Sequence, residues 1–413
     1  MPQASKVSPK NSTIVRPYKN ATAAALRHGF GTLERLAPGL GALWAERLWF
    51  ARPPLPPGAL APPDGLPPGA AFELELPSGV LRGQSWGQGP NAYLVHGWGG
   101  WGLQLSGFIA PLLKAGFRVI SFDMPSHGAS DPGRLGARAG TLPEFAEALA
   151  AVVGAQGPAH ALIAHSMGAT AAASVLREGV PAAAAVFISP MADPVQYTHA
   201  FAQRFGFGEQ TRARLQRRVE AVEGLPMAYY NVPRMARDRR MPPLLVVHDR
   251  ADRETPWTDG EAIARAWPGA RLLSTQGLGH RRILADADVI RSVTGFVQSV
   301  DVQAAPPRKA DVPAARSAGA TRAAVLATLL AGLWVAGAAL MATPARAQEQ
   351  APEQSREVEA ADAAVEPTPA VGPIDEPAED TPAARAAQRR EAQRRLRDEL
   401  RGLSGYGFIL PTP

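Results

Sequence analysis

The sequence predicts an α/β fold with a mainly parallel sheet covered by helices. Short apolar runs alternate with helical stretches as far as Val300, and this alternation is typical of βαβ units. The alternation breaks between Pro190 and Met241, where a basic helical stretch is too long for an ordinary loop. We therefore expect residues 190–241 to form a helical cap over the carboxyl edge of the sheet.

Composition limits the chemistry open to this chain. Its 413 residues, 46% of them hydrophobic, allow one large enzyme domain with added segments. The absence of cysteine excludes disulfides, cysteine-ligated zinc and thiol nucleophiles. The net charge of +6 comes from arginines scattered through expected helices, so we expect no nucleic-acid partner.

The first 70 residues are expected to be a leader and a connector. Spaced apolar residues from Ala21 to Phe50 predict one or two short amphipathic helices. Because their basic polar face is weak, we expect them to pack on the main domain rather than to bind a membrane surface. Residues 51–70 are rich in proline and predict a non-helical connector.

The main domain is expected to span residues 71–300. It opens with Phe72, Leu74 and Leu76, which alternate with glutamates before the turn Pro77-Ser78-Gly79 and so predict a β-hairpin. Six further apolar runs predict strands: AYLV before His96, RVISF before Asp123, ALIA before His165, AAVFI before Ser189, LLVV before His248 and RLLS before Thr275.

The C-terminal part changes character. After a linker over residues 301–322, residues 323–342 carry no charge and are long enough to cross a bilayer. Preceding basic residues would leave the main domain in the cytoplasm, anchored at the inner membrane with the tail outside. The sequence Ala345-Arg346-Ala347 equally fits a signal-peptidase site, and a buried core helix is the third alternative. Residues 343–413 predict a largely disordered tail with one charged helix.

The stretch LIAHSMGAT places Ser166 between an apolar run and an alanine-rich helix. Such a serine can simply cap the helix. However, Ala164 and Gly168 supply the small flanking residues that a strained nucleophile elbow requires. Ser166 is therefore the candidate nucleophile.

A serine hydroxyl needs a base, an orienting acid and donors for the oxyanion. His280, on a glycine-flanked loop after the last expected strand, is the candidate base. Asp252 is the preferred acid, and Asp249 and Glu254 are its close rivals. The candidate oxyanion donors are two backbone N–H groups, those of Met167 and Trp98.

Together these pieces resemble the α/β-hydrolase family over about residues 72–300. The matching motifs are HGWGG, FDMPSHGASD, AHSMG, HDRADRETP and GLGH, in the family's order. The resemblance implies an eight-stranded sheet, a cap after the sixth strand, Ser166 as nucleophile, and Asp252 and His280 as its partners. Ser126 and Ala164 stand where the family usually has glycine.

The expected activity is hydrolysis of an acyl bond in a small-molecule substrate, with no metal or organic cofactor. A carboxylic ester is the family's commonest case, whereas thioester, lactone, amide and C–C bonds remain open. A serine rather than an aspartate nucleophile disfavours dehalogenase and epoxide-hydrolase chemistry. The alternative is a catalytically idle hydrolase-fold scaffold or binding protein tethered to the membrane. The sequence does not indicate the oligomeric state.

The expected cap contains aromatic and arginine residues of open role. We expect the aromatic residues to form the core of the cap rather than a substrate pocket: Phe201, Phe205, Phe207, Tyr229 and Tyr230. The arginines could steer an anionic substrate, but we expect them to form a solvated helix face: Arg212, Arg214, Arg217 and Arg218.

Overall fold

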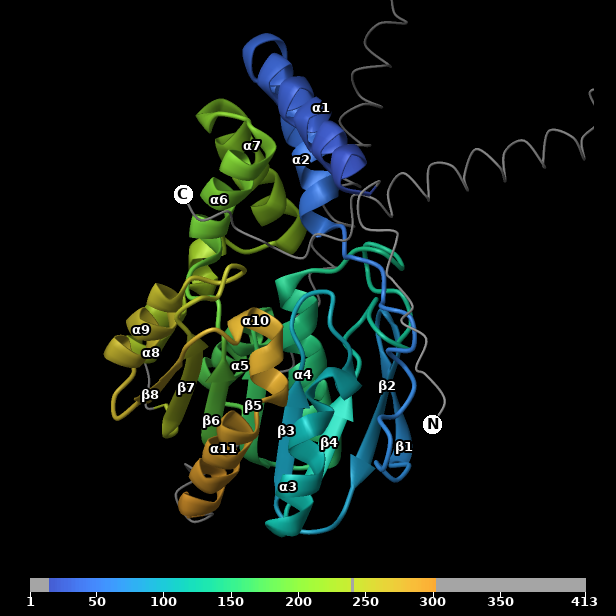
Figure 1. Ribbon diagram of the computed structural model, residues 1–413, viewed down its shortest axis with the longest axis vertical. Helices are drawn as coiled ribbons and strands as arrows, with labels where there is room; N and C mark the ends of the chain where they lie inside the picture. Colours follow the sequence, from blue (N-terminus) through green and yellow to red (C-terminus); the bar gives the residue numbers. More distant parts are fainter. Residues whose placement is uncertain (1–14, 239–240, 302–413) are drawn as a thin grey trace, which may run out of the picture. The chain divides into compact units, whose positions relative to one another are not determined.

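The computed structural model describes residues 15–238 and 241–301, which contain a single eight-stranded sheet of mostly parallel strands (Figure 1). Its spatial order is β1-β2-β4-β3-β5-β6-β7-β8, and only the β1–β2 and β2–β4 pairs are antiparallel. The strands are β1 Ala70–Leu76, β2 Gly79–Trp86, β3 Asn91–Val95, β4 Arg118–Phe122, β5 Ala159–His165, β6 Ala182–Ile188, β7 Leu244–Asp249 and β8 Arg271–Thr275. The predicted fold class and each predicted strand are thus confirmed.

Both faces of the central strands are buried. Leu162 and Ala164 of β5 face one hydrophobic core, whereas Ala161 and Ile163 face the other. Neighbouring side chains of a strand point to opposite faces, so a strand covered on both sides must be apolar throughout. This explains why the parallel strands read as continuous apolar runs, while β1, at the edge, alternates with glutamates.

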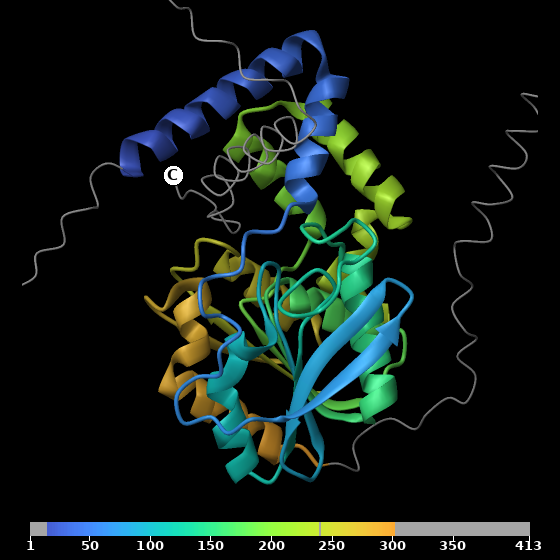
Figure 2. The ribbon, with the colours of Figure 1, turned by 90° about the vertical axis from the view of Figure 1, so that its right-hand side faces the viewer.

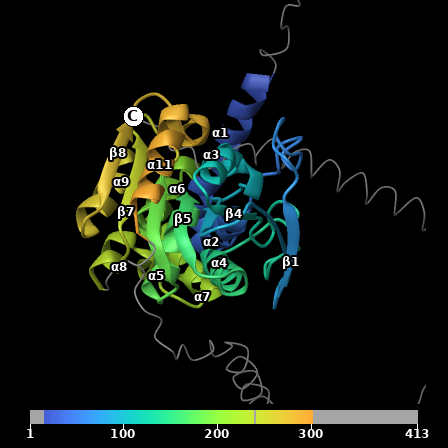
Figure 3. The same cartoon turned by 90° about the horizontal axis from the view of Figure 1, so that it is seen from below.

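Helices cover the two faces of the sheet in separate layers (Figure 3). One core contains residues of α4, α5, α8 and α9, and the other contains residues of α3 and α11. Their bounds are α3 Ile109–Lys114, α4 Leu142–Gln156, α5 Met167–Arg177, α8 Val232–Asp238, α9 Trp257–Ala266, α10 Gly279–Arg282 and α11 Ala287–Ser299. Short 3-10 helices cover Gly102–Phe108, Met227–Tyr230 and Ile283–Ala285.

Several helices begin at residues that satisfy their free backbone N–H groups. The Thr141 hydroxyl accepts a hydrogen bond from the Glu144 backbone N–H at the start of α4, and it donates one to the Glu144 carboxylate. Asp286 accepts from two backbone N–H groups at the start of α11. Each such cap stabilises a helix by about 1 kcal/mol, so the boundaries have local causes.

A cap of helices lies between β6 and β7, over the carboxyl edge of the sheet (Figure 1). It contains α6 Pro194–Phe205 and α7 Glu209–Glu223. Phe201 and Phe207 are buried in its core. Tyr230 is also buried, but it belongs to the core between the sheet and the helices α4, α5, α8 and α9.

Of the four arginines of α7, Arg212 is buried, contrary to the expectation of a solvated face, whereas Arg217 is exposed as expected. Arg212 is only 8% exposed, and its guanidinium donates to Thr198, Glu209 and Gln216. Arg218 forms an ion pair with Glu46 of the leader. The reason is tertiary, because helix α7 lies between α6 and the leader, and the Arg212 side chain reaches Thr198 of α6.

The leader forms two helices, α1 Val15–Leu36 and α2 Pro38–Phe50. Pro38 occupies the first turn of α2, where a missing N–H costs nothing. Both helices lie beside α6 and α7, above the sheet (Figure 2). The connector then crosses to β1 without forming a helix.

The membrane prediction concerns another part of the chain. Among the described residues, no helix combines the length and apolar character that crossing a membrane requires. The apolar stretch 323–342, the rest of the linker and the tail 343–413 lie outside the described residues.

Candidate active site

The candidate site lies where the parallel strands end. Loops that follow β3, β5, β7 and β8 carry Trp98, Ser166, Asp252 and His280. In parallel sheets the carboxyl ends of the strands share one edge, which is the usual place for ligand binding. The sheet therefore gathers residues that are more than 180 positions apart in sequence.

Ser166 occupies the sharp turn between β5 and α5. Its backbone angles, φ 55° and ψ −126°, are strained for a residue that carries a side chain. The turn is also crowded, since a Cβ at Gly97 would lie 2.7 Å from Ser166 Cβ, and one at Gly168 would lie 2.4 Å from the His96 carbonyl oxygen. Such a turn presents the Ser166 side chain at the sheet edge and explains the small neighbours that the sequence shows.

His280 and Asp252 form a direct pair. His280 Nδ1 lies 2.8 Å from Asp252 Oδ2, and the Asp252 side chain is fully buried. The backbone N–H groups of Glu254 and Thr255 donate to Asp252 Oδ1 at 2.8 and 3.0 Å. Burial alone raises the pKa of Asp252, but hydrogen bonds from His248 and His280 outweigh it and hold this pKa well below its ordinary value. Asp252 is thus a fixed carboxylate that orients the His280 ring.

The two rival acids have other partners. Asp249 Oδ2 accepts from Thr275 Oγ1 at 2.7 Å and from the Leu278 backbone N–H at 2.9 Å, so it holds the loop that leads to His280. Glu254 lies 3.9 Å from His280 Nε2, the other ring nitrogen, and 3.2 Å from Arg281 Nε. Only Asp252, among the three, is hydrogen-bonded to Nδ1 in the described structure.

Ser166 and His280 line the same cavity, of about 240 Å³. The hydrogen bonds of His280 side chain and carbonyl within the described residues go to Asp252, Thr255 and His165, and none goes to Ser166. Catalytic hydrogen bonds are often long or poorly aligned before substrate binds. The structure thus brings the alcohol and the imidazole into one cavity without joining them.

Two residues whose backbone N–H groups are unbonded in the described structure border this cavity. Trp98 and Met167 both line it, and neither backbone N–H donates a hydrogen bond within the described part of the chain. Met167 is also the first residue of α5, where the helix dipole favours negative charge. A substrate oxyanion placed between them could satisfy both groups.

The FDMPSHGASD segment supports the loop that carries Trp98. Asp123 accepts from the Gly102 backbone N–H at 2.7 Å, and His127 Nε2 accepts from the Gly99 backbone N–H at 3.0 Å. Burial lowers the pKa of His127 well below its ordinary value, so the ring is neutral and can accept. Ser126 adopts φ 64°, a left-handed conformation that favours glycine, as its place in the motif suggests.

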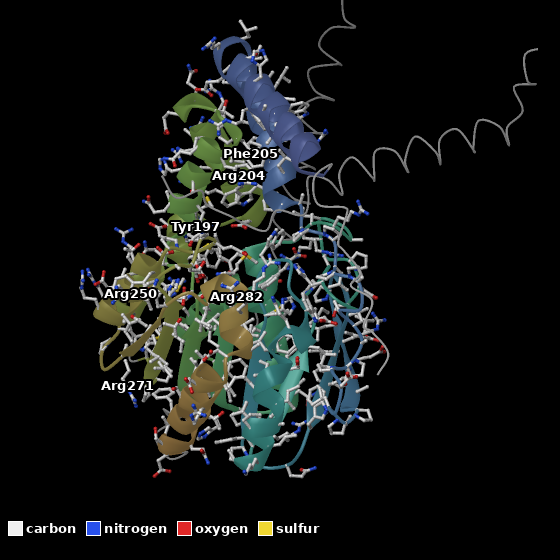
Figure 4. The ribbon with its side chains drawn as sticks, viewed as in Figure 1. Tyr197, Arg204, Phe205, Arg250, Arg271 and Arg282 are labelled. Carbon is white, nitrogen blue, oxygen red and sulfur yellow. The ribbon has the colours of Figure 1, made fainter. Side chains whose placement is uncertain are left out.

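The cavity includes residues that the sequence did not reveal. Tyr197, Glu223 and Trp101 line it, as do five leader and connector residues: Trp49, Phe50, Pro53, Pro54 and Pro56. Tyr197 lies on α6 where the cap meets the sheet edge (Figure 4) and donates to Asp259 at 2.8 Å. Burial, with the nearby carboxylates of Glu144 and Glu220, raises the pKa of Glu223 to about 7. The aromatic end of α2 and the proline-rich start of the connector were the available sequence signal.

A match to a known protein family covers most of the sheet, the cap and the candidate site. Residues 92–293 match the alpha/beta hydrolase family. This part of the chain belongs to the α/β-hydrolase family. The matched residues include all of β3 except Asn91, the strands β4 to β8, the cap and every candidate catalytic residue. No curated protein shows a significant sequence match to the chain.

Solved structures similar to this hydrolase include esterases and a lipase. An esterase from Thermogutta terrifontis is 18% identical with a TM-score of 0.42, and the alignment covers 55% of this chain and 98% of that one. An esterase from a Rhodococcus species is 18% identical with a TM-score of 0.42, covering 56% and 100%. A monoacylglycerol lipase from Paleococcus ferrophilus is 21% identical with a TM-score of 0.41, covering 53% and 98%. At these identities the likeness says nothing about the substrate of this hydrolase.

Proposed function

We propose that this protein is a serine hydrolase that cleaves an acyl bond, with carboxylic esters as its substrate class. One observation carries the proposal: Ser166 lines the same cavity as His280, and His280 is hydrogen-bonded to the buried Asp252. The free N–H groups of Trp98 and Met167 in that cavity add the donors that acyl transfer requires. The proposal needs no metal or organic cofactor.

The mechanism follows from these positions. His280 Nε2 takes the proton of Ser166 Oγ, and the oxygen attacks the substrate carbonyl carbon to form a tetrahedral intermediate. The Trp98 and Met167 N–H groups bind the oxyanion, and His280 then gives the proton to the leaving alcohol. Water repeats the sequence on the acyl-enzyme and releases the acid. Asp252 keeps Nδ1 protonated and stabilises the imidazolium.

A fluorophosphonate probe and a short p-nitrophenyl ester test the proposal on the full chain. We expect the parent protein to label and to hydrolyse the ester, and Ser166→Ala to lose labelling and about six orders of magnitude in turnover. Ser174→Ala is the matched control, because Ser174 lies on α5, the helix that follows Ser166, is 1% exposed and does not line the cavity.

Two outcomes would contradict the proposal. Labelling and turnover that persist in Ser166→Ala would remove Ser166 from the chemistry. A correctly folded parent protein that neither labels nor hydrolyses any member of an ester and thioester panel would favour the catalytically idle scaffold instead.

A further inference from the structure

The leader contributes a wall of the cavity that contains Ser166. Trp49 and Phe50 lie at the end of α2, and Pro53, Pro54 and Pro56 follow in the connector. All five precede β1, the first strand of the hydrolase fold. The rest of the cavity wall comes from the sheet-edge loops and the cap, so three separate parts of the chain enclose it.

The leader is packed into the cap rather than resting on it. Phe30 and Phe50 share one buried cluster with Phe201, Phe207 and Leu215. The ring centroids of Trp49 and Phe201 lie 5.4 Å apart, in an edge-to-face arrangement. Aromatic pairs of this geometry add to the stabilisation from buried area.

Polar contacts fix the leader to the ends of the cap helices. Glu34 accepts from the backbone N–H groups of Gln210 and Thr211, both at 3.1 Å, in the first turn of α7. The residue before α7 is glycine, which has no side chain to bind the free N–H groups of the first turn. The Glu34 carboxylate of the leader binds them instead. Arg27 donates to two carbonyl oxygens in the last turn of α6, at 2.9 and 3.0 Å. Cap and leader therefore form one unit.

The connector also touches the loop of the candidate oxyanion donor. Gly99, next to Trp98, has φ 66°, and a Cβ built on it would lie 2.4 Å from Pro53 Cγ. The residue before Pro53 is also held, because the Arg52 backbone N–H donates to the Arg138 carbonyl oxygen at 2.8 Å. The connector thus contacts two loops of the hydrolase fold, one through Pro53 and the other through Arg52.

We propose that the leader and the start of the connector, together residues 15–56, are a substrate-binding element that forms one lid with the cap, and that Trp49 limits the length of the apolar acyl group that fits. This inference rests on the proposed function, because it concerns the acyl pocket of that site. The wall is made of tryptophan, phenylalanine and proline, so it offers dispersion contacts and no charge to the part of the substrate that it faces. The substrate class it selects is an ester with a short to medium apolar acyl chain.

Trp49→Ala tests the inference against Trp44→Ala as a matched control. Trp44 lies on the same helix, is 47% exposed and does not line the cavity. We expect Trp49→Ala to raise the ratio of kcat/KM for p-nitrophenyl decanoate over butanoate about tenfold, within the range by which apolar pockets discriminate chain length. Trp49→Phe, which keeps the aromatic contact with Phe201, should raise it to a smaller extent, and Trp44→Ala should leave it unchanged.

The failure of this inference differs from the failure of the proposed function. If Ser166→Ala abolishes turnover but Trp49→Ala, Trp49→Phe and Trp44→Ala all keep the parent ratio, the lid is refuted and the function stands. If the parent protein hydrolyses no ester, the ratio of its affinities for decanoate and butanoate, measured by calorimetry in the parent and in each variant, tests the effect of Trp49 on chain length without turnover. An equal change of that ratio in the two alanine variants would also refute a specific role of Trp49.

Discussion

The carboxyl of Glu223 makes a specific prediction about stability. Burial raises its pKa to about 7 from an ordinary value of 4.5, and Glu144 and Glu220 add to the effect while a hydrogen bond from the Leu142 backbone N–H opposes it. Between these two pH values the unfolded chain loses this proton and the folded protein keeps it. The folded state therefore loses stability as the pH rises from 4.5 to 7, and above pH 7 the cost stays constant.

Replacing Glu223 by glutamine removes this cost. Each pKa interval of one corresponds to about 1.4 kcal/mol, so Glu223→Gln should gain up to about 3 kcal/mol of unfolding free energy, relative to the parent protein, on going from pH 4.5 to pH 8. The gain should appear mainly between pH 4.5 and 7. Urea unfolding of the full chain, followed by tryptophan fluorescence across this pH range, measures it.

The control for this measurement is Glu75→Gln. Glu75 is exposed on β1, its side chain has no hydrogen-bond or ion-pair partner within the described residues, and its replacement removes the same charge. A stability gain in Glu223→Gln that is the same at pH 5 and pH 8 would refute the reasoning, because it would mean that the folded state does not hold the Glu223 proton.

Three further predictions concern the site itself. Asp252→Asn should lower kcat for a p-nitrophenyl ester about 10⁴-fold because His280 Nδ1 loses its carboxylate acceptor; a loss under tenfold would transfer the role to a rival acid. Gly168→Ala should cost about 1–3 kcal/mol in thermal unfolding, since its Cβ would lie 2.4 Å from the His96 carbonyl oxygen. Gly154→Ala, with no atom within 4 Å of the new Cβ, should instead be neutral or slightly stabilising, and equal effects would contradict the crowding argument. Asp249→Asn should reduce kcat more than it changes KM, because Asp249 holds the loop before His280 through Thr275 and Leu278; unaltered kinetics would show that this loop needs no such anchor.

The sequence by itself determined the parts of the protein that depend on local pattern. The apolar runs predict strands because both faces of a central strand are buried, and this requirement acts residue by residue. Ser166 is recognisable for a similar reason: a strained elbow needs small residues two positions away on either side, here Ala164 and Gly168, and Met167 follows the nucleophile directly. These features are local, so a single sequence carries them.

Only the tertiary structure decided which distant groups meet. Asp249, Asp252 and Glu254 lie within six residues, and their distinction depends on how the turn after β7 aims each carboxylate at the loop after β8. The leader was expected merely to pack on the main domain, yet it lines the cavity and caps α7 through Glu34. Periodicity shows that a helix face must be buried but not which surface will bury it, because that choice depends on the packing of the whole fold.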